Sequence, residues 1–227
     1  MKDEVAKKIL IKVKKDYELI ANEFNASRQY IWPDLNIFEN FIKPNMKVLD
    51  LGCGNGRLYD MLKQKNIQYL GIDNCDRFIK IAQGKYHDNN SLFRVGDITA
   101  YPKTTNNYDA IFMVAALQHI PSVKIRQQVM NNIFSSLKKD GLLLMTNWNL
   151  WQPKYKKYIR KNNIKKIFGQ SELDFNDCQF TSWQIKIDRY CHAFTLKEIK
   201  KLLTLSNLKI LKNYQTPNNI ITIAQKP

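Results

Sequence analysis

The amino-acid sequence predicts an α/β domain with a mostly parallel sheet, helices on both faces, and an antiparallel strand pair at the C-terminal end. The first observation is the stretch 47–56, K-V-L-D-L-G-C-G-N-G, in which a short apolar run typical of a buried strand leads into three glycines within five residues. The second is the near-continuous apolar run at 108–116, as expected of a central parallel strand buried on both faces. The third is the pair of alternating segments 208–214 and 219–225, joined by T-P-N, which predicts the closing antiparallel pair.

The residues before the first strand predict a helical cap over 1–44. Residues 3–25 place apolar side chains at helical spacing with lysines on the other face, which indicates one or two amphipathic helices packed outside the sheet. In the segment 17–33, several aromatic side chains surround a single arginine, Arg28. Either the aromatic residues only pack helices and Arg28 is a surface charge, or this segment folds over a ligand and Arg28 and Trp32 face the active site. A short helix, ended by a proline, completes the cap.

The glycine turn after the first strand is the strongest sign of a ligand site. Glycine lets the backbone turn tightly and approach a ligand closely, because no Cβ stands in the way. The next apolar strand, 69–72, ends in Asp73, 19 positions after Gly54, where an acid is placed to accept hydrogen bonds from ribose hydroxyls. The spacing G-x-G-x-G, with Asp50 before it, differs from the pyrophosphate-binding fingerprint, and the sequence has no triphosphate-binding loop. An ordinary strand-to-helix turn is the alternative, and Asp73 argues against it.

The chain after the glycine turn continues the alternation of helices and strands. Asp97 follows the third strand, and His119 follows the fourth, at the carboxyl edge where an open α/β sheet binds ligands. His119 is therefore either near the chemistry or a structural residue at the start of the next helix. No internal repeat and no linker divides the chain, which predicts one domain over 1–227. The expected elements are helices at 57–65, 76–87, 122–138 and 196–205 and strands at 69–72, 92–95, 108–116 and 142–148.

Composition sets limits on location and on partners. The sequence has no run of roughly 18 apolar residues and no N-terminal signal peptide, so a cytoplasmic location is the default and no membrane partner is expected. The four cysteines form no C-x-x-C pair, and with only three histidines a metal site is not expected. The net charge of +16 suggests a polyanionic partner such as nucleic acid, although a chain rich in Lys, Asn and Ile is also what an AT-rich genome encodes.

Residues 151–191 form a basic insertion between the fifth strand and the last helix. Within it the stretch 154–166, K-Y-K-K-Y-I-R-K-N-N-I-K-K, contains seven basic residues, two tyrosines and no acid. Such a run either forms a solvated helix face or contacts phosphates, because basic side chains supply the sequence-independent part of nucleic-acid affinity and aromatic rings can stack on bases. An insertion at this edge of the sheet lies beside the active site. The candidate substrate contacts in the run are Lys156, Lys157, Lys165 and Lys166.

The residues D-L-G-C-G-N-G resemble the first motif of the class I S-adenosylmethionine-dependent methyltransferases, whose sheet is Rossmann-like. In that family the glycine turn faces the amino-acid end of the cofactor, and the acid after the second strand, here Asp73, holds the ribose. An acid after the third strand reaches the adenine amino group, and the neighbouring apolar residue covers the ring, as Asp97 and Ile98 would. The resemblance implies S-adenosyl-L-methionine as the cofactor. The implied cofactor-binding residues are Asp50, Gly52, Gly54, Asn55, Asp73, Asn74, Asp97, Ile98 and Ala115.

Further segments resemble one subfamily, the tRNA methyltransferases that esterify 5-carboxymethyluridine at the wobble position. They are Y-E-L-I-A-N-E-F-N-A-S-R-Q-Y-I-W-P at 17–33, A-A-L-Q-H-I at 115–120, G-L-L-L-M-T-N-W-N-L-W-Q at 141–152 and D-R-Y-C-H-A-F at 188–194. The chain departs from the family where Q-H replaces paired histidines and where T-S-W at 181–183 replaces V-P-W. The resemblance implies tRNA as the partner and leaves room for an activating protein.

The reaction implied by this resemblance is an in-line displacement at a sulfonium methyl group. A carboxylate nucleophile is already ionised at neutral pH and needs no general base, so the protein has to position it and match its charge. The candidate catalytic residues are Arg28, His119 and Arg189, of which the arginines would hold the carboxylate; Trp32 and His192 would line the pocket with His119. A methyltransferase for a small carboxylic acid or metabolite and a non-catalytic RNA- or partner-binding protein are the alternatives, and the complete glycine and acid set argues against the second.

Overall fold

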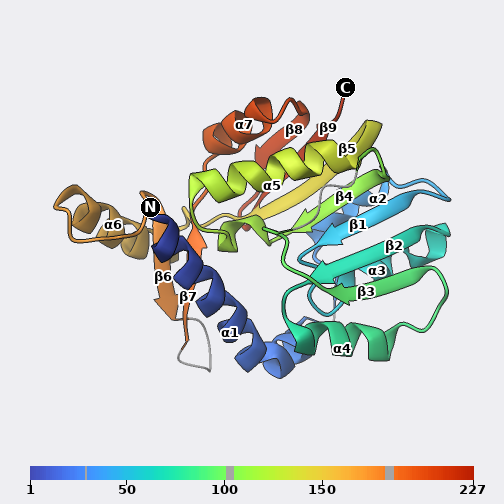
Figure 1. Ribbon diagram of the computed structural model, residues 1–227, viewed down its shortest axis with the longest axis horizontal. Coiled ribbons are helices and arrows are strands. Elements are labelled where there is room, and N and C mark those ends of the chain that lie inside the picture. The colour runs from blue at the N-terminus through green and yellow to red at the C-terminus, as the bar shows by residue number, and fades with distance from the viewer. Residues whose placement is uncertain (29, 101–104, 182–186) are drawn as a thin grey trace.

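The computed structural model describes residues 1–28, 30–100, 105–181 and 187–227, and its centre is a seven-stranded sheet (Figure 1). The strands are β1 Lys47–Leu51, β2 Gln68–Asp73, β3 Ser91–Val95, β4 Tyr108–Val114, β5 Leu137–Trp148, β8 Lys209–Gln215 and β9 Asn219–Gln225. Their order is β3-β2-β1-β4-β5-β9-β8. The first five run parallel, β9 pairs antiparallel with β5, and β8 pairs antiparallel with β9. This confirms the predicted mostly parallel sheet with an antiparallel C-terminal pair.

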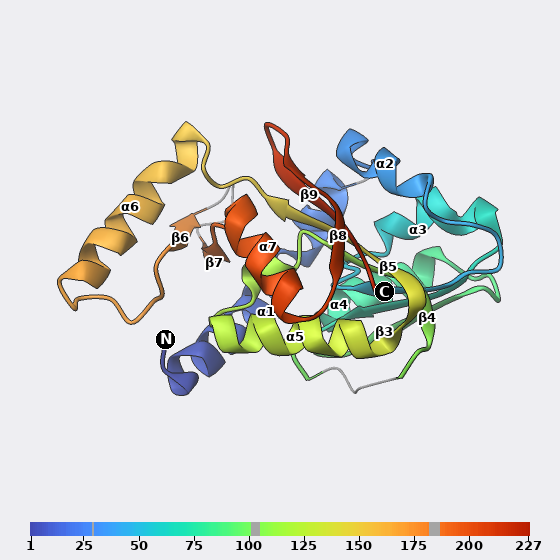
Figure 2. The same ribbon diagram turned by 90° about the horizontal axis from the view of Figure 1, so that it is seen from above.

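Helices cover both faces of the sheet, as predicted (Figures 1 and 2). They are α1 Asp3–Ser27, α2 Asn36–Glu39, α3 Arg57–Leu62, α4 Asp76–Lys85, α5 Val123–Ser136, α6 Pro153–Ile167 and α7 Leu196–Leu205. On one face α5 and α7 bury Ile133 and Leu203 against the central strands. On the other, α2, α3 and α4 bury Phe38, Leu62 and Ala82. Two apolar layers therefore sandwich the sheet, and its carboxyl edge stays available for a site.

Some boundaries differ from those expected. The fifth strand begins at Leu137 rather than at 142, because Leu137 already pairs with Tyr108 and the chain bends within the strand at Asp140, where φ is 62°. The helix expected over 122–138 accordingly ends at Ser136. The N-terminal region forms a single helix, and its first turn carries two acids that match the positive end of the helix dipole.

The segment expected as a basic insertion contains α6 and a small sheet of its own. Strands β6 Asp177–Thr181 and β7 Asp188–His192 pair antiparallel, with Cys178 opposite Cys191. Helix α6 packs on β6 through Ile159 and projects away from the seven-stranded sheet in both views (Figures 1 and 2). The basic stretch is therefore helical, and the hairpin beneath it leads back into the main body.

Helix α1 connects this hairpin with the main sheet. Its first half packs Ile9 and Val13 against Tyr190 of β7, and its second half packs Ala21 against Phe78 of α4. In the described part of the chain, no helix combines the length and apolar character needed to cross a membrane. Among the same residues, no group of three or more His, Cys, Asp or Glu side chains is arranged to hold a metal ion.

Candidate functional site

A pocket opens at the carboxyl ends of β1, β2 and β4, where the predicted cofactor residues converge. Every residue predicted to bind the cofactor lines it: Asp50, Gly52, Gly54, Asn55, Asp73, Asn74, Asp97, Ile98 and Ala115. Arg28, Trp32 and His119 line the same pocket. Residues from the cap, the glycine turn and three strand ends therefore lie around one cavity, which is where a parallel sheet of this kind binds a ligand.

The glycine turn leaves no space for a side chain at its first position. Gly52 has a φ of +79°, and a Cβ built there would lie 2.7 Å from the Cβ of Ala116. On the facing strand, Ala115 also adopts a positive φ, 50°, and its N–H donates to the carbonyl of Thr146 at 2.9 Å. Two neighbouring backbone segments thus pack closely in left-handed conformations that side chains disfavour. This close packing forms the rigid floor of the pocket.

Asp50 is a buried acid beneath the glycine turn. Tyr69 donates its hydroxyl to Asp50 Oδ2 at 2.6 Å, whereas Oδ1 is buried and has no hydrogen-bond partner among the described residues. Burial raises the pKa of Asp50 to about 7, even though the bond from Tyr69 acts in the opposite direction. A buried acceptor that lines the pocket is available to a ligand donor.

Asp73 ends β2 at the rim of the pocket. Its two oxygens accept the N–H groups of Gly54 and Cys75, each at 2.9 Å. These bonds fix the carboxylate against the glycine turn, while each oxygen keeps a further lone pair. Burial raises the pKa of Asp73, and the two backbone donors partly offset that effect. Just after β3, Asp97 Oδ1 accepts the N–H and the hydroxyl of Thr99, both at 2.8 Å.

The end of α1 lies over the glycine turn. Asn55, which is 5% exposed, donates to Asn25 Oδ1 at 2.8 Å, and the ring of Phe24 lies 3.8 Å from where a Cβ of Gly54 would be. Tyr17 and Phe24 of this helix also line the pocket. Helix α1 therefore forms one wall of the cavity.

Two hydrogen bonds fix the tautomer of His119. Its Nδ1 lies 3.0 Å from the carbonyl oxygen of Tyr190, which can only accept, so Nδ1 carries the hydrogen. Its Nε2 then accepts from the hydroxyl of Tyr17 at 2.9 Å. Burial lowers the pKa of His119 to about 4, and the positive charge of Arg189 acts in the same direction. The imidazole is therefore neutral near pH 7, and both of its nitrogens are engaged.

A second pocket adjoins the first and shares Arg28, Trp32 and Trp148 with it. Arg189 lines this second pocket, with its guanidinium 5.1 Å from the ring centre of Trp148. Arg28 lies 5.8 Å from the ring centre of Trp32. Burial lowers the pKa of Arg28, and the positive charge of Arg189 lowers it further. The structure thus brings together the two arginines singled out from the sequence, although they are 161 residues apart in the chain.

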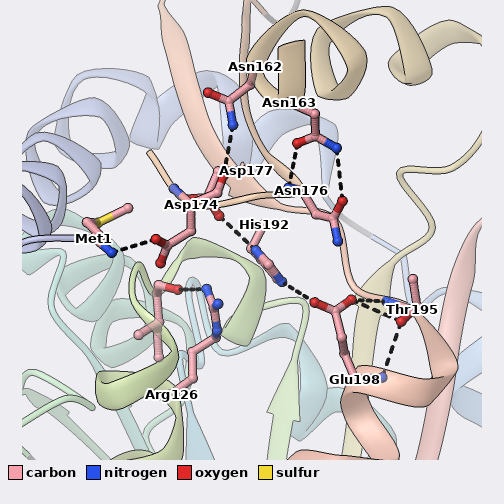
Figure 3. Close-up of polar contacts among 11 residues, drawn as sticks. Met1, Arg126, Asn162, Asn163, Asp174, Asn176, Asp177, His192, Thr195 and Glu198 are labelled. Carbon is pink, nitrogen blue, oxygen red and sulfur yellow. Dashed lines mark hydrogen bonds and ion pairs between the residues drawn. The ribbon is translucent and has the colours of Figure 1, made fainter. Parts of the chain in front are cut away.

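His192 does not line either pocket, contrary to its expected position. Figure 3 shows its ring between two carboxylates, with Nδ1 at 2.7 Å from Asp177 and Nε2 at 3.2 Å from Glu198. Burial alone would raise the pKa of Glu198, but the contact with His192 and the bonds from Thr195 lower it to about 2. Because Glu198 also completes the capping box of α7 with Thr195, His192 joins the insertion hairpin to that helix.

The candidate lysines lie along α6 and outside the two pockets. Lys156, Lys157 and Lys165 are exposed, and none of them pairs with an acid in the described chain. Lys166 is half-buried and donates to the carbonyl of Ser171 at 3.4 Å. The segment 181–183 is where the sequence differs from the V-P-W of the resembling subfamily. Of its residues, Ser182 and Trp183 lie outside the described part of the chain.

Sequence reasoning did not place Tyr17 and Trp148 among the site residues. Tyr17 is one of the aromatic residues in the segment 17–33, for which both helix packing and a place over a ligand were open, and only the fold shows that it reaches His119, 102 positions later. Trp148 stands in the quoted segment 141–152, but its place between the two pockets depends on where β5 ends.

Comparison with known proteins identifies the family. Residues 42–207 match a family model described as a methyltransferase domain. The chain belongs to this methyltransferase family. It is 24% identical over 224 residues to the tRNA (carboxymethyluridine(34)-5-O)-methyltransferase of Schizosaccharomyces pombe, an alignment that covers 92% of this chain and 94% of that protein. The methyltransferase is thus similar to that enzyme over nearly its whole length.

Solved structures agree with the family. A SAM-dependent methyltransferase from Methanosarcina mazei superimposes with a TM-score of 0.71 at 23% identity, over 86% of this chain and 98% of that chain. A methyltransferase of Haloferax volcanii, solved in complex with the Trm112 methyltransferase activator, superimposes with a TM-score of 0.62 at 13% identity, over 94% and 97% of the two chains. The chain is a class I S-adenosylmethionine-dependent methyltransferase, and S-adenosylmethionine is its cofactor.

The pocket of this methyltransferase fits that cofactor. The rim offers the oriented carboxylate of Asp73, and the buried Oδ1 of Asp50 lacks a partner among the described residues, so both acids can accept hydrogen bonds from a ligand. The remaining lining is largely apolar, as is usual for a small-molecule site with a few fixed polar groups.

Proposed function

We propose that this methyltransferase esterifies a carboxylate on RNA, the 5-carboxymethyl group of a wobble uridine in tRNA, in the cytoplasm. The observation that carries the proposal is Arg189, a half-buried cation that pairs with no described carboxylate and shares its pocket with Arg28. Asp34, the acid that lines this pocket in the described chain, already accepts from Thr216 and Asn219, at 2.9 and 2.6 Å. A pocket that holds two guanidinium groups favours an anionic ligand, and a carboxylate matches their two-pronged geometry.

The cofactor residues take the roles that the family resemblance implies. Asp73 is proposed to accept the ribose hydroxyls, because its carboxylate is fixed at the rim by two backbone donors. Asp97 and Ile98 are proposed to receive the adenine, and the turn from Gly52 to Asn55 the amino-acid end. When bound, S-adenosylmethionine supplies an electrophilic methyl group.

The residues around the substrate position it rather than activate it. A carboxylate with an ordinary pKa is fully ionised at neutral pH, so no side chain has to remove a proton. Arg28 and Arg189 hold the anion, and the neutral His119 forms a wall without adding charge. Trp32 and Trp148 supply apolar surface between the two pockets, which limits access of water. The catalytic contribution of these residues is orientation.

Helix α6 is proposed to contact the phosphates of the RNA. Replacing exposed Lys156, Lys157 and Lys165 by Gln should flatten the salt dependence of tRNA binding by roughly 0.7–0.9 units per lost phosphate contact. The matched control replaces three exposed lysines of α7 outside the two pockets, Lys197, Lys200 and Lys201, by Gln. An α6 variant with the wild-type slope would leave these lysines as a solvated face.

Transfer of a labelled methyl group from S-adenosylmethionine to tRNA tests the function directly. The acceptor is tRNA that carries 5-carboxymethyluridine, and the product is then treated with mild alkali. A methyl ester releases its label, whereas an N- or C-methyl group keeps it. Label that resists alkali would refute the ester chemistry, and label found only on small acids would instead support a metabolite enzyme.

An activating protein is also part of the proposal. The similar structure from Haloferax volcanii was solved with its activator, and this chain shares that fold. The assay is therefore run both on the purified chain and on material isolated with its co-purifying proteins. Full activity of the chain alone would refute a requirement for an activator.

A further inference from the structure

One wall of the second pocket consists of carboxamides. Asn149, Gln152, Asn218 and Asn219 all line it, together with the arginines that are proposed to hold the carboxylate. Carboxamides carry no charge, so they cannot attract a carboxylate as the arginines do. They do offer paired donors and acceptors, as the edge of a nucleobase does.

Two of these four carboxamides serve the fold. Asn149 donates to the carbonyls of Thr216 and Pro217, both at 3.2 Å, and accepts from the N–H of Trp151 at 3.2 Å. Asn219 donates to Asp34 at 2.6 Å. Asn149 thus joins the segment after β5 to the β8–β9 turn, and Asn219 joins that turn to the N-terminal cap at Asp34.

The other two keep free hydrogen-bonding groups. Gln152 donates through Nε2 to the carbonyl of Asn149 at 2.9 Å, which fixes the amide so that Oε1 remains as an acceptor. Asn218 is held by its backbone, since its carbonyl accepts from the N–H of Asn149 at 2.8 Å. Its exposed carboxamide forms no hydrogen bond with the described residues, so it has both a donor and an acceptor to offer.

We infer that Gln152 and Asn218 read the imide edge of a uracil ring in this pocket. The inference rests on the proposed function and adds the recognition of the base. Uracil presents an N3–H donor between two carbonyl acceptors. Oε1 of Gln152 accepts from N3–H, and the amide of Asn218 donates to a neighbouring carbonyl. Cytosine has a lone pair at N3, which would face the oxygen of Gln152 and leave both acceptors without a donor.

The rest of the pocket suits such a ring. Trp32, Trp148 and Tyr155 provide apolar surfaces that a planar base can contact, as aromatic side chains do for unstacked RNA bases. Arg28 lines both this pocket and the cofactor pocket, and Arg189 lines this pocket. The second pocket can therefore bind both ends of a carboxymethyluridine. The arginines bind the carboxylate, and the carboxamides bind the base.

The experiment compares two synthetic anticodon stem-loop RNAs that differ by one methyl group. Both carry 5-carboxymethyluridine at the wobble position, and one is also methylated at N3, which removes the donor. The wild-type protein should lose about tenfold or more in kcat/KM on the N3-methylated RNA. Gln152→Leu should lower kcat/KM on the RNA without the N3 methyl group. The ratio of kcat/KM between the two RNAs should then fall to about one. Gln215→Leu, which removes an exposed carboxamide of the same hairpin outside the pocket, should keep the wild-type ratio.

The outcomes separate the inference from the function on which it rests. If Gln152→Leu methylates the RNAs with the wild-type ratio, the base-reading role is wrong while the proposed function stands, because steric exclusion of the methyl group would explain the ratio. If the wild-type protein transfers no methyl group to either RNA, alone or together with its co-purifying proteins, both are wrong. Asn218→Ala changes an exposed side chain, so its melting temperature should be unchanged while kcat/KM falls several-fold. A wild-type kcat/KM in that variant would show that Asn218 does not contact the base.

Discussion

Gly52→Ala is expected to damage both the fold and cofactor binding. The new Cβ would lie 2.7 Å from the Cβ of Ala116, and the residue would have to keep a φ of +79°. The left-handed conformation costs roughly 1–2 kcal/mol for a side-chain-bearing residue, and overpacking costs roughly 1–3 kcal/mol. The variant should therefore lose about 2–5 kcal/mol of unfolding free energy. At roughly 2–4 °C per kcal/mol for a chain of this size, the melting temperature should fall by about 4–20 °C.

The matched control for this prediction is Gly84→Ala. Gly84 lies in α4, is exposed, and a Cβ there would meet nothing within 4 Å. Alanine is favoured over glycine in a helix by roughly 0.5–1 kcal/mol, so this variant should be slightly more stable than the wild type. Thermal melting with and without S-adenosylmethionine measures both variants.

A double variant separates the two costs at Gly52. Adding Ala116→Gly to Gly52→Ala removes the clashing atom but keeps the strained φ, so it should restore about 1–3 kcal/mol. Calorimetry of S-adenosylmethionine binding should follow the same order among the variants. A Gly52→Ala protein that melts with the wild type, or a double variant that restores nothing, would refute the steric reasoning.

Three further predictions concern the acids and the histidines. Asp73→Ala should abolish most of the melting-temperature increase caused by S-adenosylmethionine, since a ligand selective for the folded state stabilises it by mass action; an unchanged increase would exclude Asp73 as a cofactor contact. Glu198, whose pKa falls from 4.5 to about 2 on folding, contributes stability above pH 4.5 that is lost as the pH drops towards 2. Urea denaturation should therefore show a deficit for Glu198→Gln at pH 6 that disappears near pH 2, and a constant deficit would contradict this pairing. In Tyr17→Phe, loss of the donor to Nε2 should raise the pKa of His119 from about 4, as NMR titration can measure, and an unchanged pKa would contradict the hydrogen bond.

The parts of the fold that could be predicted from the sequence are those with local signals. The apolar runs of β1 and β4 and the glycines between β1 and α3 are visible in short windows, and α7 begins and ends where its pattern does. The β6–β7 sheet had no such signal, because D-C-Q-F-T and D-R-Y-C-H are short and mix polar with apolar residues. Their pairing depends on contacts with α6 and α1, which lie elsewhere in the chain.

The residues of the candidate site also differ in whether the sequence could predict their position. The cofactor residues belong to one motif and three strand ends, so their convergence at one edge follows from parallel pairing. The role of His192 could not be predicted in this way. A histidine next to a resembling motif was expected in the pocket, but Asp177 and Glu198 hold its ring on the other side of the hairpin. A sequence does not show which carboxylates a histidine will meet.

The position of α1 has a consequence for the order of events in turnover. This helix contacts β7 at one end and lies over the glycine turn at the other, and the two pockets share Arg28, Trp32 and Trp148. If RNA binds in the second pocket as proposed, it obstructs exchange of the cofactor on the side where the two pockets meet, while α1 covers the side of the glycine turn. We expect compulsory-order kinetics, in which the cofactor enters first and the methylated RNA departs before the spent cofactor. Product inhibition by S-adenosylhomocysteine should then be competitive with S-adenosylmethionine and non-competitive with RNA.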